Sequence, residues 1–156
     1  MTTPSRGFDS RSEPVERDSF LPSLRLLVID DDLIFRTVIA KVAGKIGFTA
    51  TEAASYGEAE RLLQSNVYDC ITLDLSLGRN YGIEVVQLLG RIGCKSPIIV
   101  VSGAGQSVAG LAIGVGRMLK LNMFEPIPKP VNFELLQSLL SQVRQQRAAR
   151  GVLDPR

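Results

Sequence analysis

The sequence has 156 residues, and its 45% hydrophobic and 22% charged content is typical of a globular domain. A formal net charge of +2 is too small to indicate nucleic-acid binding, and no apolar stretch approaches the roughly 20 residues of a membrane helix. Histidine is absent, which excludes an internal imidazole base and a histidine-ligated metal.

Residues 1–22 are rich in serine, proline, arginine and glutamate, and they predict a disordered N-terminal arm. A folded domain is expected over residues 23–145, followed by a C-terminal tail over 146–156. The polar N-terminus shows no signal peptide. Cys70 and Cys94 form neither a disulfide framework nor a metal knuckle, so we expect a cytoplasmic protein with reduced thiols.

The first predicted strand, residues 24–29, ends in three acidic residues, Asp30, Asp31 and Asp32. Clustered carboxylates repel one another unless something compensates their charge, and a hard divalent cation such as Mg²⁺ commonly does so. The competing interpretation is that Asp32 merely caps the following helix. That interpretation explains one aspartate and leaves the other two without a role.

After this strand, apolar positions alternate between helical and strand spacing along the chain. Asp32 and Gly47 bound a predicted helix, and Ser55 and Glu58 have the form of a capping box that opens a second one. The predicted helices cover about residues 33–46, 55–64, 83–92, 107–121 and a last segment capped by Asn132. The other predicted strands cover residues 48–53, 68–74, 96–102 and 123–127, the last of them an edge strand because it contains Pro126.

Five strands that alternate with five helices predict an α/β fold, a doubly wound parallel sheet with right-handed crossovers. The two strands that end in carboxylates, 24–29 and 68–74, should lie side by side. The flavodoxin-like strand order 2-1-3-4-5 has this property. We therefore expect that order.

Polar residues end four of the predicted strands, and the fold would bring them to one edge of the sheet. These residues are Asp30, Asp31, Asp74, Ser102 and Lys129. An aspartate can accept a phosphoryl group as an acyl phosphate, and a lysine ammonium is a compact countercharge for phosphoryl oxygens. Phosphoryl transfer requires little beyond positioning and charge neutralisation. Each residue alone is commonplace, so the prediction depends on their conjunction.

This set resembles the receiver domain of bacterial two-component response regulators. The similarity extends over about residues 24–143. It is carried by Leu27-Val28-Ile29-Asp30-Asp31-Asp32, Leu73-Asp74-Leu75 with Gly82, Val100-Val101-Ser102-Gly103 and Lys129-Pro130.

The resemblance implies roles for individual residues. Asp74 would be the phospho-acceptor, Ser102 the switch hydroxyl and Lys129 the phosphoryl-binding lysine. The Lys129-Pro130 peptide bond would be a candidate for the cis form.

The resemblance also implies a Mg²⁺ cofactor. Asp31 and Asp74 would ligate the ion, with the backbone carbonyl of Ser76 as a further ligand. Asp30 would act mainly through a bound water.

The sequence departs from the family at two positions. Gly78 stands where receivers usually have proline four residues after the acceptor. Pro126 stands where they usually have an aromatic switch residue three positions before the lysine, and Phe124 lies two residues too early. These departures put signalling through an aromatic rotamer in doubt and leave the phosphorylation chemistry intact.

The resemblance predicts a single-domain response regulator, not an enzyme, that is phosphorylated by a histidine kinase or phosphotransfer protein and signals through protein contact. Homodimerisation through the fourth helix, fifth strand and fifth helix is possible, and we expect neither a nucleic-acid nor a membrane partner. One alternative is a pseudo-receiver that binds partners without phosphorylation. Another is a haloacid-dehalogenase-type phosphatase with Asp30 as nucleophile, although the sequence after Lys129 lacks the acidic pair which that family needs.

Overall fold

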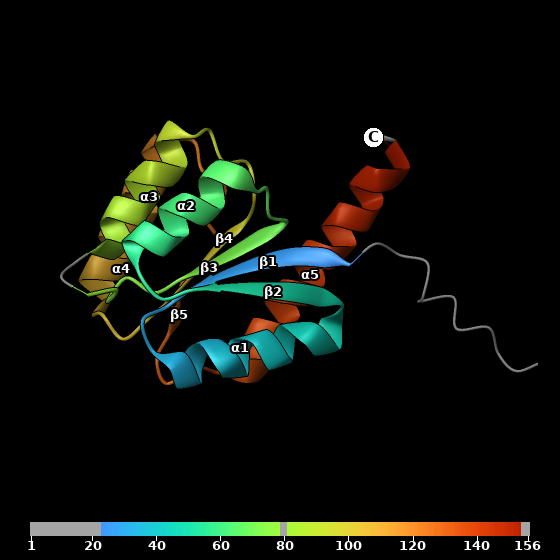
Figure 1. Cartoon of the computed structure of the whole chain (residues 1–156), viewed down its shortest axis with the longest axis horizontal. Helices are drawn as coiled ribbons and strands as arrows, with labels where there is room; N and C mark the ends of the chain where they lie inside the picture. Colours follow the sequence, from blue (N-terminus) through green and yellow to red (C-terminus); the bar gives the residue numbers. More distant parts are fainter. Residues whose placement is uncertain (1–22, 79–80, 154–156) are drawn as a thin grey trace, which may run out of the picture.

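A computed structural model describes residues 23–78 and 81–153. They form a five-stranded parallel sheet in the order β2-β1-β3-β4-β5, which confirms the predicted fold class and strand order (Figure 1). The predicted disordered arm, residues 1–22, lies outside the described residues. The strands are β1 (Leu24–Ile29), β2 (Phe48–Ala53), β3 (Cys70–Leu73), β4 (Ile98–Ser102) and β5 (Ile127–Pro128).

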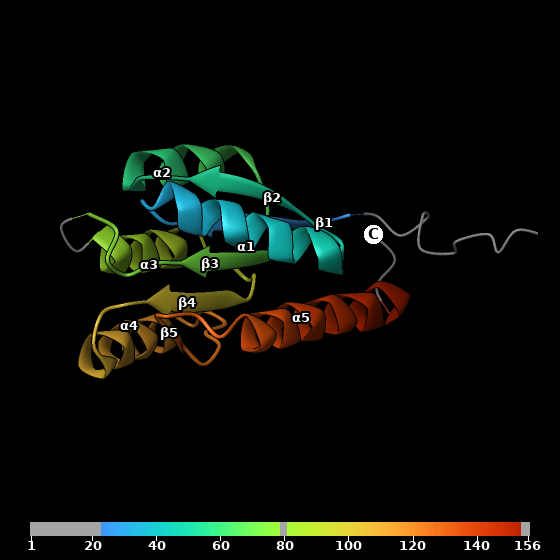
Figure 2. The same cartoon turned by 90° about the horizontal axis from the view of Figure 1, so that it is seen from below.

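Helices cover both faces of this sheet, as Figures 1 and 2 show from two directions. The helices are α1 (Leu33–Ile46), α2 (Tyr56–Ser65), α3 (Tyr81–Arg91), α4 (Gln106–Met118) and α5 (Phe133–Leu153). Side chains of α2, α3 and α4 share one hydrophobic cluster with one face of the sheet, and those of α1 and α5 share a second cluster with the other face. Every residue of β3 and β4 and the last four residues of β1 are buried between these layers, as expected of parallel strands covered on both sides.

Local capping chemistry determines where the first two helices begin. The Asp32 carboxylate accepts hydrogen bonds from the backbone N–H groups of Ile34 and Phe35, and α1 ends at Gly47, whose φ of 96° is left-handed. The Ser55 hydroxyl accepts from the N–H of Glu58 at the start of α2. Both helix starts were predicted from these capping residues, and both are confirmed.

The segment around β5 differs from the prediction. A strand was expected over residues 123–127, but the ladder with β4 pairs Val101 with Ile127 and Ser102 with Pro128. Met123 makes only an isolated bridge, to Ile98. Pro126 has no N–H to donate to a ladder, so the continuous strand is lost and pairing resumes after it.

The last helix extends beyond the apolar stripe that predicted it. Helix α5 runs to Leu153, into the stretch expected to be a tail, because its arginine, glutamine and alanine residues have high helix propensity. The proposed domain limits at residues 23 and 145 stay a prediction. Among residues 23–78 and 81–153, no helix has the length and apolarity to span a bilayer.

The sheet register places the ends of β1 and β3 together. Ile29 pairs with Leu73, and the N–H of Asp74 donates to the carbonyl oxygen of Ile29 at 2.9 Å. The loop after Asp74 passes directly under α3, because a Cβ at Gly82 would lie 2.4 Å from Leu75 Cα. Glycine at position 82 therefore allows α3 to approach the segment that carries Asp74.

Candidate functional site

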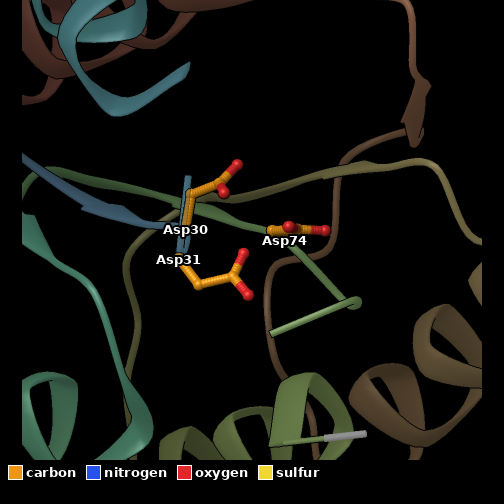
Figure 3. A group of neighbouring side chains, drawn as sticks. All are labelled: Asp30, Asp31 and Asp74. Carbon is orange, nitrogen blue, oxygen red and sulfur yellow. The ribbon is translucent and has the colours of Figure 1, made fainter. Parts of the chain in front are cut away.

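Three carboxylates from two strands converge at the carboxyl edge of the sheet. Asp30 and Asp31 follow β1 and Asp74 follows β3, and Figure 3 shows their side chains directed toward a common space. One carboxylate oxygen from each lies within 4.8 Å of the other two. Asp30 is 2% exposed and Asp74 is 3% exposed, whereas Asp31 is exposed. The sequence prediction that these three residues meet is therefore confirmed.

Lys129 brings the opposite charge to this pocket from the loop after β5. Its Nζ lies 3.0 Å from Oδ2 of Asp30 and 3.3 Å from Oδ2 of Asp74. The peptide bond to Pro130 is cis, as the resemblance suggested. Partial burial alone would lower the pKa of the Lys129 ammonium, but its hydrogen bond to Asp30 and the negative charges of Asp74 and Asp30 outweigh this and raise the pKa. Lys129 therefore stays charged at neutral pH.

Burial of Asp30 disfavours its charged form through desolvation. Burial raises the pKa of its carboxyl group, although hydrogen bonds from the Asp32 N–H (2.8 Å to Oδ1) and from Lys129 oppose that rise. The nearby charge of Asp74 raises the pKa further. A single lysine thus does not fully compensate the buried negative charge, and a bound cation would relieve the remainder.

Two serine hydroxyls extend the site toward β4. The N–H of Ser76 donates to Asp74 Oδ1 at 2.9 Å, and the hydroxyl oxygens of Ser76 and Ser102 lie 3.4 Å apart. Ser102 ends β4, is 3% exposed and accepts a hydrogen bond from the N–H of Ala104 at 3.0 Å. The structure thus places Ser102 in the same site as the acids, through Ser76.

Three further residues support the pocket. Arg36 on α1 donates to the carbonyl oxygen of Asp30 at 2.8 Å, and the Phe35 ring centroid lies 4.1 Å from Lys129 Nζ. The N–H of Gly78 points to Oδ2 of Asp31 at 3.5 Å, a donor that a proline at this position would lack. Sequence reasoning missed Phe35 and Arg36, and it singled out Gly78 only as a departure from the family. The sequence signal for Phe35 and Arg36 was limited to helical periodicity: both follow the Asp32 cap closely and fall in the first turn of α1.

The donor set fits a hard divalent cation. Carboxylate oxygens are the ligands that Mg²⁺ and Ca²⁺ prefer, and Asp30, Asp31 and Asp74 offer three within reach of one ion. Asp32 does not join them, because its carboxylate caps α1. The acidic triplet therefore divides into a pocket pair, Asp30 and Asp31, and a helix cap.

Comparisons with known protein sequences agree on one family. The profile of the response regulator receiver domain matches residues 26–141. The regulatory protein VirG of Agrobacterium fabrum (strain C58) is 36% identical over 111 residues, which are 70% of this chain and 41% of VirG. The sensor histidine kinase RcsC of Salmonella typhimurium is 26% identical over 129 residues, which are 80% of this chain and 13% of RcsC. The chain thus spans less than half the length of these curated relatives.

Solved structures show the same fold. The receiver domain of the Francisella response regulator 1452 superposes with a TM-score of 0.69 at 21% identity and covers 80% of this chain and 99% of its own. A response regulator from Burkholderia pseudomallei, whose structure contains a phosphorylated aspartic acid, a calcium ion and citrate, superposes with a TM-score of 0.63 at 25% identity. That match covers 85% of this chain and 76% of the Burkholderia chain.

Proposed function

The chain belongs to the response regulator receiver domain family, and from this premise we propose that it accepts a phosphoryl group on Asp74 from a histidine kinase or histidine phosphotransfer protein. One observation carries the proposal. Asp30, Asp31 and Asp74 each place a carboxylate oxygen within 4.8 Å of the others, and Lys129 Nζ lies 3.0 to 3.3 Å from two of them.

In the proposed reaction, a carboxylate oxygen of Asp74 forms a bond to phosphorus while the bond from phosphorus to the donor's imidazole nitrogen breaks. The Lys129 ammonium would neutralise charge on the transferred phosphoryl oxygens. The Ser102 hydroxyl, which reaches the site beside Ser76, would donate to one of these oxygens. The chain would act as a phospho-acceptor switch, with at most self-phosphorylation and self-dephosphorylation activity.

A magnesium ion would be held by Asp31 and Asp74 and by the backbone carbonyl of Ser76, with Asp30 acting through a water molecule. When bound, it supplies positive charge against the phosphoryl oxygens. The structure of the Burkholderia relative contains a phosphorylated aspartic acid and a calcium ion, which supports the use of a divalent cation here. The raised pKa of Asp30 supports the same assignment, because a buried carboxylate with incomplete charge compensation gains from a cation.

We propose that the output is contact with another protein and that the chain acts in the cytoplasm. Exposed apolar side chains on α4, Leu111 at 58% and Met118 at 84%, support a protein contact. The free thiols of Cys70 and Cys94 are consistent with a reducing compartment. Homodimerisation through α4, β5 and α5 stays part of this proposal and is open to light scattering.

A phosphorylation-independent interaction module is the second candidate. Pro126 occupies the expected place of a switch aromatic, and Phe124 packs with the α1 and α5 cluster rather than beside α4. The phosphatase alternative has no comparable support, because it assigns no role to Asp74, which the structure places inside the acidic group.

Phosphorylation can be tested with acetyl phosphate, a small phosphoryl donor, followed by intact-protein mass spectrometry. The wild type should gain one phosphoryl group in the presence of Mg²⁺ and none after chelation of the metal. Asp74→Asn should gain none. Asp32→Asn is the matched control, since asparagine caps a helix as well as aspartate does, and it should gain the phosphoryl group normally. An equal gain in Asp74→Asn would reject the proposal.

A further inference from the structure

A cavity of about 440 Å³ lies between α4 and the β4–β5 end of the sheet, beside the proposed switch hydroxyl. Buried residues form its floor, and exposed residues of α4 and of the segment before β5 form its mouth. The floor consists of Val100, Ser102, Ala109, Ile113 and Ile127. This volume lies in the range of natural small-molecule sites.

Two exposed glycines of α4 border this cavity. Gly110 and Gly114 line it, and a Cβ added to either would meet no atom within 4 Å. Gly116, two residues further along α4, has a packing reason, because its Cβ would lie 2.5 Å from the sulfur of Met123. Glycine lowers helix stability relative to alanine, and nothing in the fold requires it at positions 110 and 114. At both positions the space beyond the backbone is open, and no side chain of the described residues lies within 4 Å of it.

The lining indicates the chemistry of an occupant. Apart from the Ser102 hydroxyl, the floor is aliphatic, so it suits an uncharged ring. Charged groups stay at the mouth, where exposed Arg117 and Glu125 approach to 3.8 Å. An engineered cavity of about 150 Å³ in another protein binds benzene, so the larger volume here accommodates two fused rings. Phe124 directly precedes Glu125 of the cavity lining. Its ring packs with the hydrophobic cluster of α1 and α5 and leaves the cavity unfilled.

We propose that this cavity is a binding site for a small, uncharged aromatic molecule of one or two fused rings. The ring would occupy the space beside Gly110 and Gly114 and contact Ile113 and Val100. A polar substituent would reach either the Ser102 hydroxyl or the Arg117–Glu125 pair at the mouth.

Occupancy of the cavity would also be coupled to phosphorylation, a step that rests on the proposed function. Ser102 lines the cavity, and its hydroxyl lies 3.4 Å from that of Ser76, whose N–H binds Asp74. A ligand and a phosphoryl group would therefore compete for the position of one side chain. Such coupling is reciprocal, so each would change the other's affinity by the same factor.

Binding can be tested with indole as the probe on the unphosphorylated, metal-free protein. The chain contains no tryptophan, so the fluorescence of indole is not obscured by an intrinsic indole. Gly114→Leu adds a large side chain at a position that lines the cavity, and we expect it to obstruct the site. Gly44→Leu is the matched control, because Gly44 is an exposed glycine of α1 whose Cβ also meets nothing within 4 Å. Thermal melts of both variants verify that they fold, and Gly110→Leu is the replacement if Gly114→Leu does not.

The expected result is saturable one-to-one binding to the wild type and to Gly44→Leu, with at least a tenfold loss of affinity in Gly114→Leu. Absence of saturable binding to the wild type, or equal binding to Gly114→Leu, would overturn the site. Self-association that Gly114→Leu alone disrupts, without indole binding, would also overturn it and assign the cavity to a protein side chain. In a second arm, acetyl phosphate and Mg²⁺ should shift the indole affinity of the wild type but not of Asp74→Asn. Binding without this shift retains the site and rejects the coupling.

Discussion

Helices α4 and α5 lie on opposite faces of the β4–β5 end of the sheet, and different contacts hold them. Helix α5 buries Leu136 and Leu140 completely, and the Arg144 guanidinium donates to the carbonyl of Ile46 at the end of α1. Helix α4 begins at Gly105 without a side-chain cap, and Gly110 and Gly114 border a cavity. Close packing therefore stabilises α5, whereas α4 has weaker support.

This difference bears on how a charge added at Asp74 could be transmitted. Ser102 stands next to the acidic pocket, and the loop that follows it leads directly into α4. Segments with few buried contacts open locally at the lowest free-energy cost. We therefore predict that α4 moves when Asp74 is modified and that α5 stays in place.

Truncation of one leucine on each helix should show the largest difference in stability. Leu140→Ala on α5 should lower the free energy of unfolding by about 2 to 5 kcal/mol, because it removes a fully buried side chain. Leu111→Ala on α4, where the leucine is 58% exposed, should change it by less than about 0.5 kcal/mol. Urea unfolding of the two variants measures both values, and similar losses would contradict the comparison.

Arginine truncation should show the same contrast at a smaller scale. Arg144→Ala removes a charged donor to the Ile46 carbonyl and should destabilise the fold by about 1.5 to 3 kcal/mol. Arg117→Ala removes only an exposed ion pair with Glu125, 3.8 Å long, and should cost less than about 0.5 kcal/mol. Equal denaturation midpoints for the two variants would indicate that the Arg144 hydrogen bond does not stabilise the packing of α5 against α1.

Neutralising a buried acid of the pocket should increase stability. Because burial raises the pKa of Asp30 above its ordinary 3.8, its ionisation opposes folding at neutral pH, and this penalty disappears as the pH falls through the raised pKa. Without divalent cations, Asp30→Asn should therefore be more stable than the wild type at pH 7. The gain should shrink as the pH is lowered through the raised pKa of Asp30. A constant gain across this range would show that its origin is not the ionisation of Asp30.

The smallest effect is expected from a glycine of α4. Gly114→Ala should stabilise the protein by about 0.5 to 1 kcal/mol, because alanine favours the helix and its Cβ enters open space. Gly116→Ala should not, since its Cβ would meet the side chain of Met123 at 2.5 Å. Thermal melts of the two variants test whether α4 tolerates an added methyl group at position 114, which lines the cavity, but not at position 116.

Local signals made much of the fold predictable. Asp32 and Gly47 determine the limits of α1 through hydrogen bonds and backbone conformation that involve only neighbouring residues. The position of β5 could not be predicted in the same way, because pairing at Ile127 depends on the register of a distant strand. The extension of α5 was missed because a polar, apolar-poor sequence can be a helix or a tail, and the Arg147–Asp69 ion pair at 3.2 Å is visible only in three dimensions.

The same distinction between local sequence signals and three-dimensional contacts applies to the site. Strand ends rich in carboxylates predicted that Asp30, Asp31 and Asp74 would meet, because parallel strands end at one edge. Arg36 and Gly78 support these acids through a backbone carbonyl and a backbone N–H, and such contacts have no residue signature. The roles assigned to Ser76, Ser102 and Lys129 stay predictions that phosphorylation experiments must test.

Amide hydrogen exchange of the full chain, with and without Mg²⁺ and acetyl phosphate, tests most directly the claim that Asp74 signals through α4. We predict that exchange changes in residues 102–118 and stays the same in residues 133–150. We also predict no change in Asp74→Asn. Equal changes in both helices, or the same changes in Asp74→Asn, would contradict this claim.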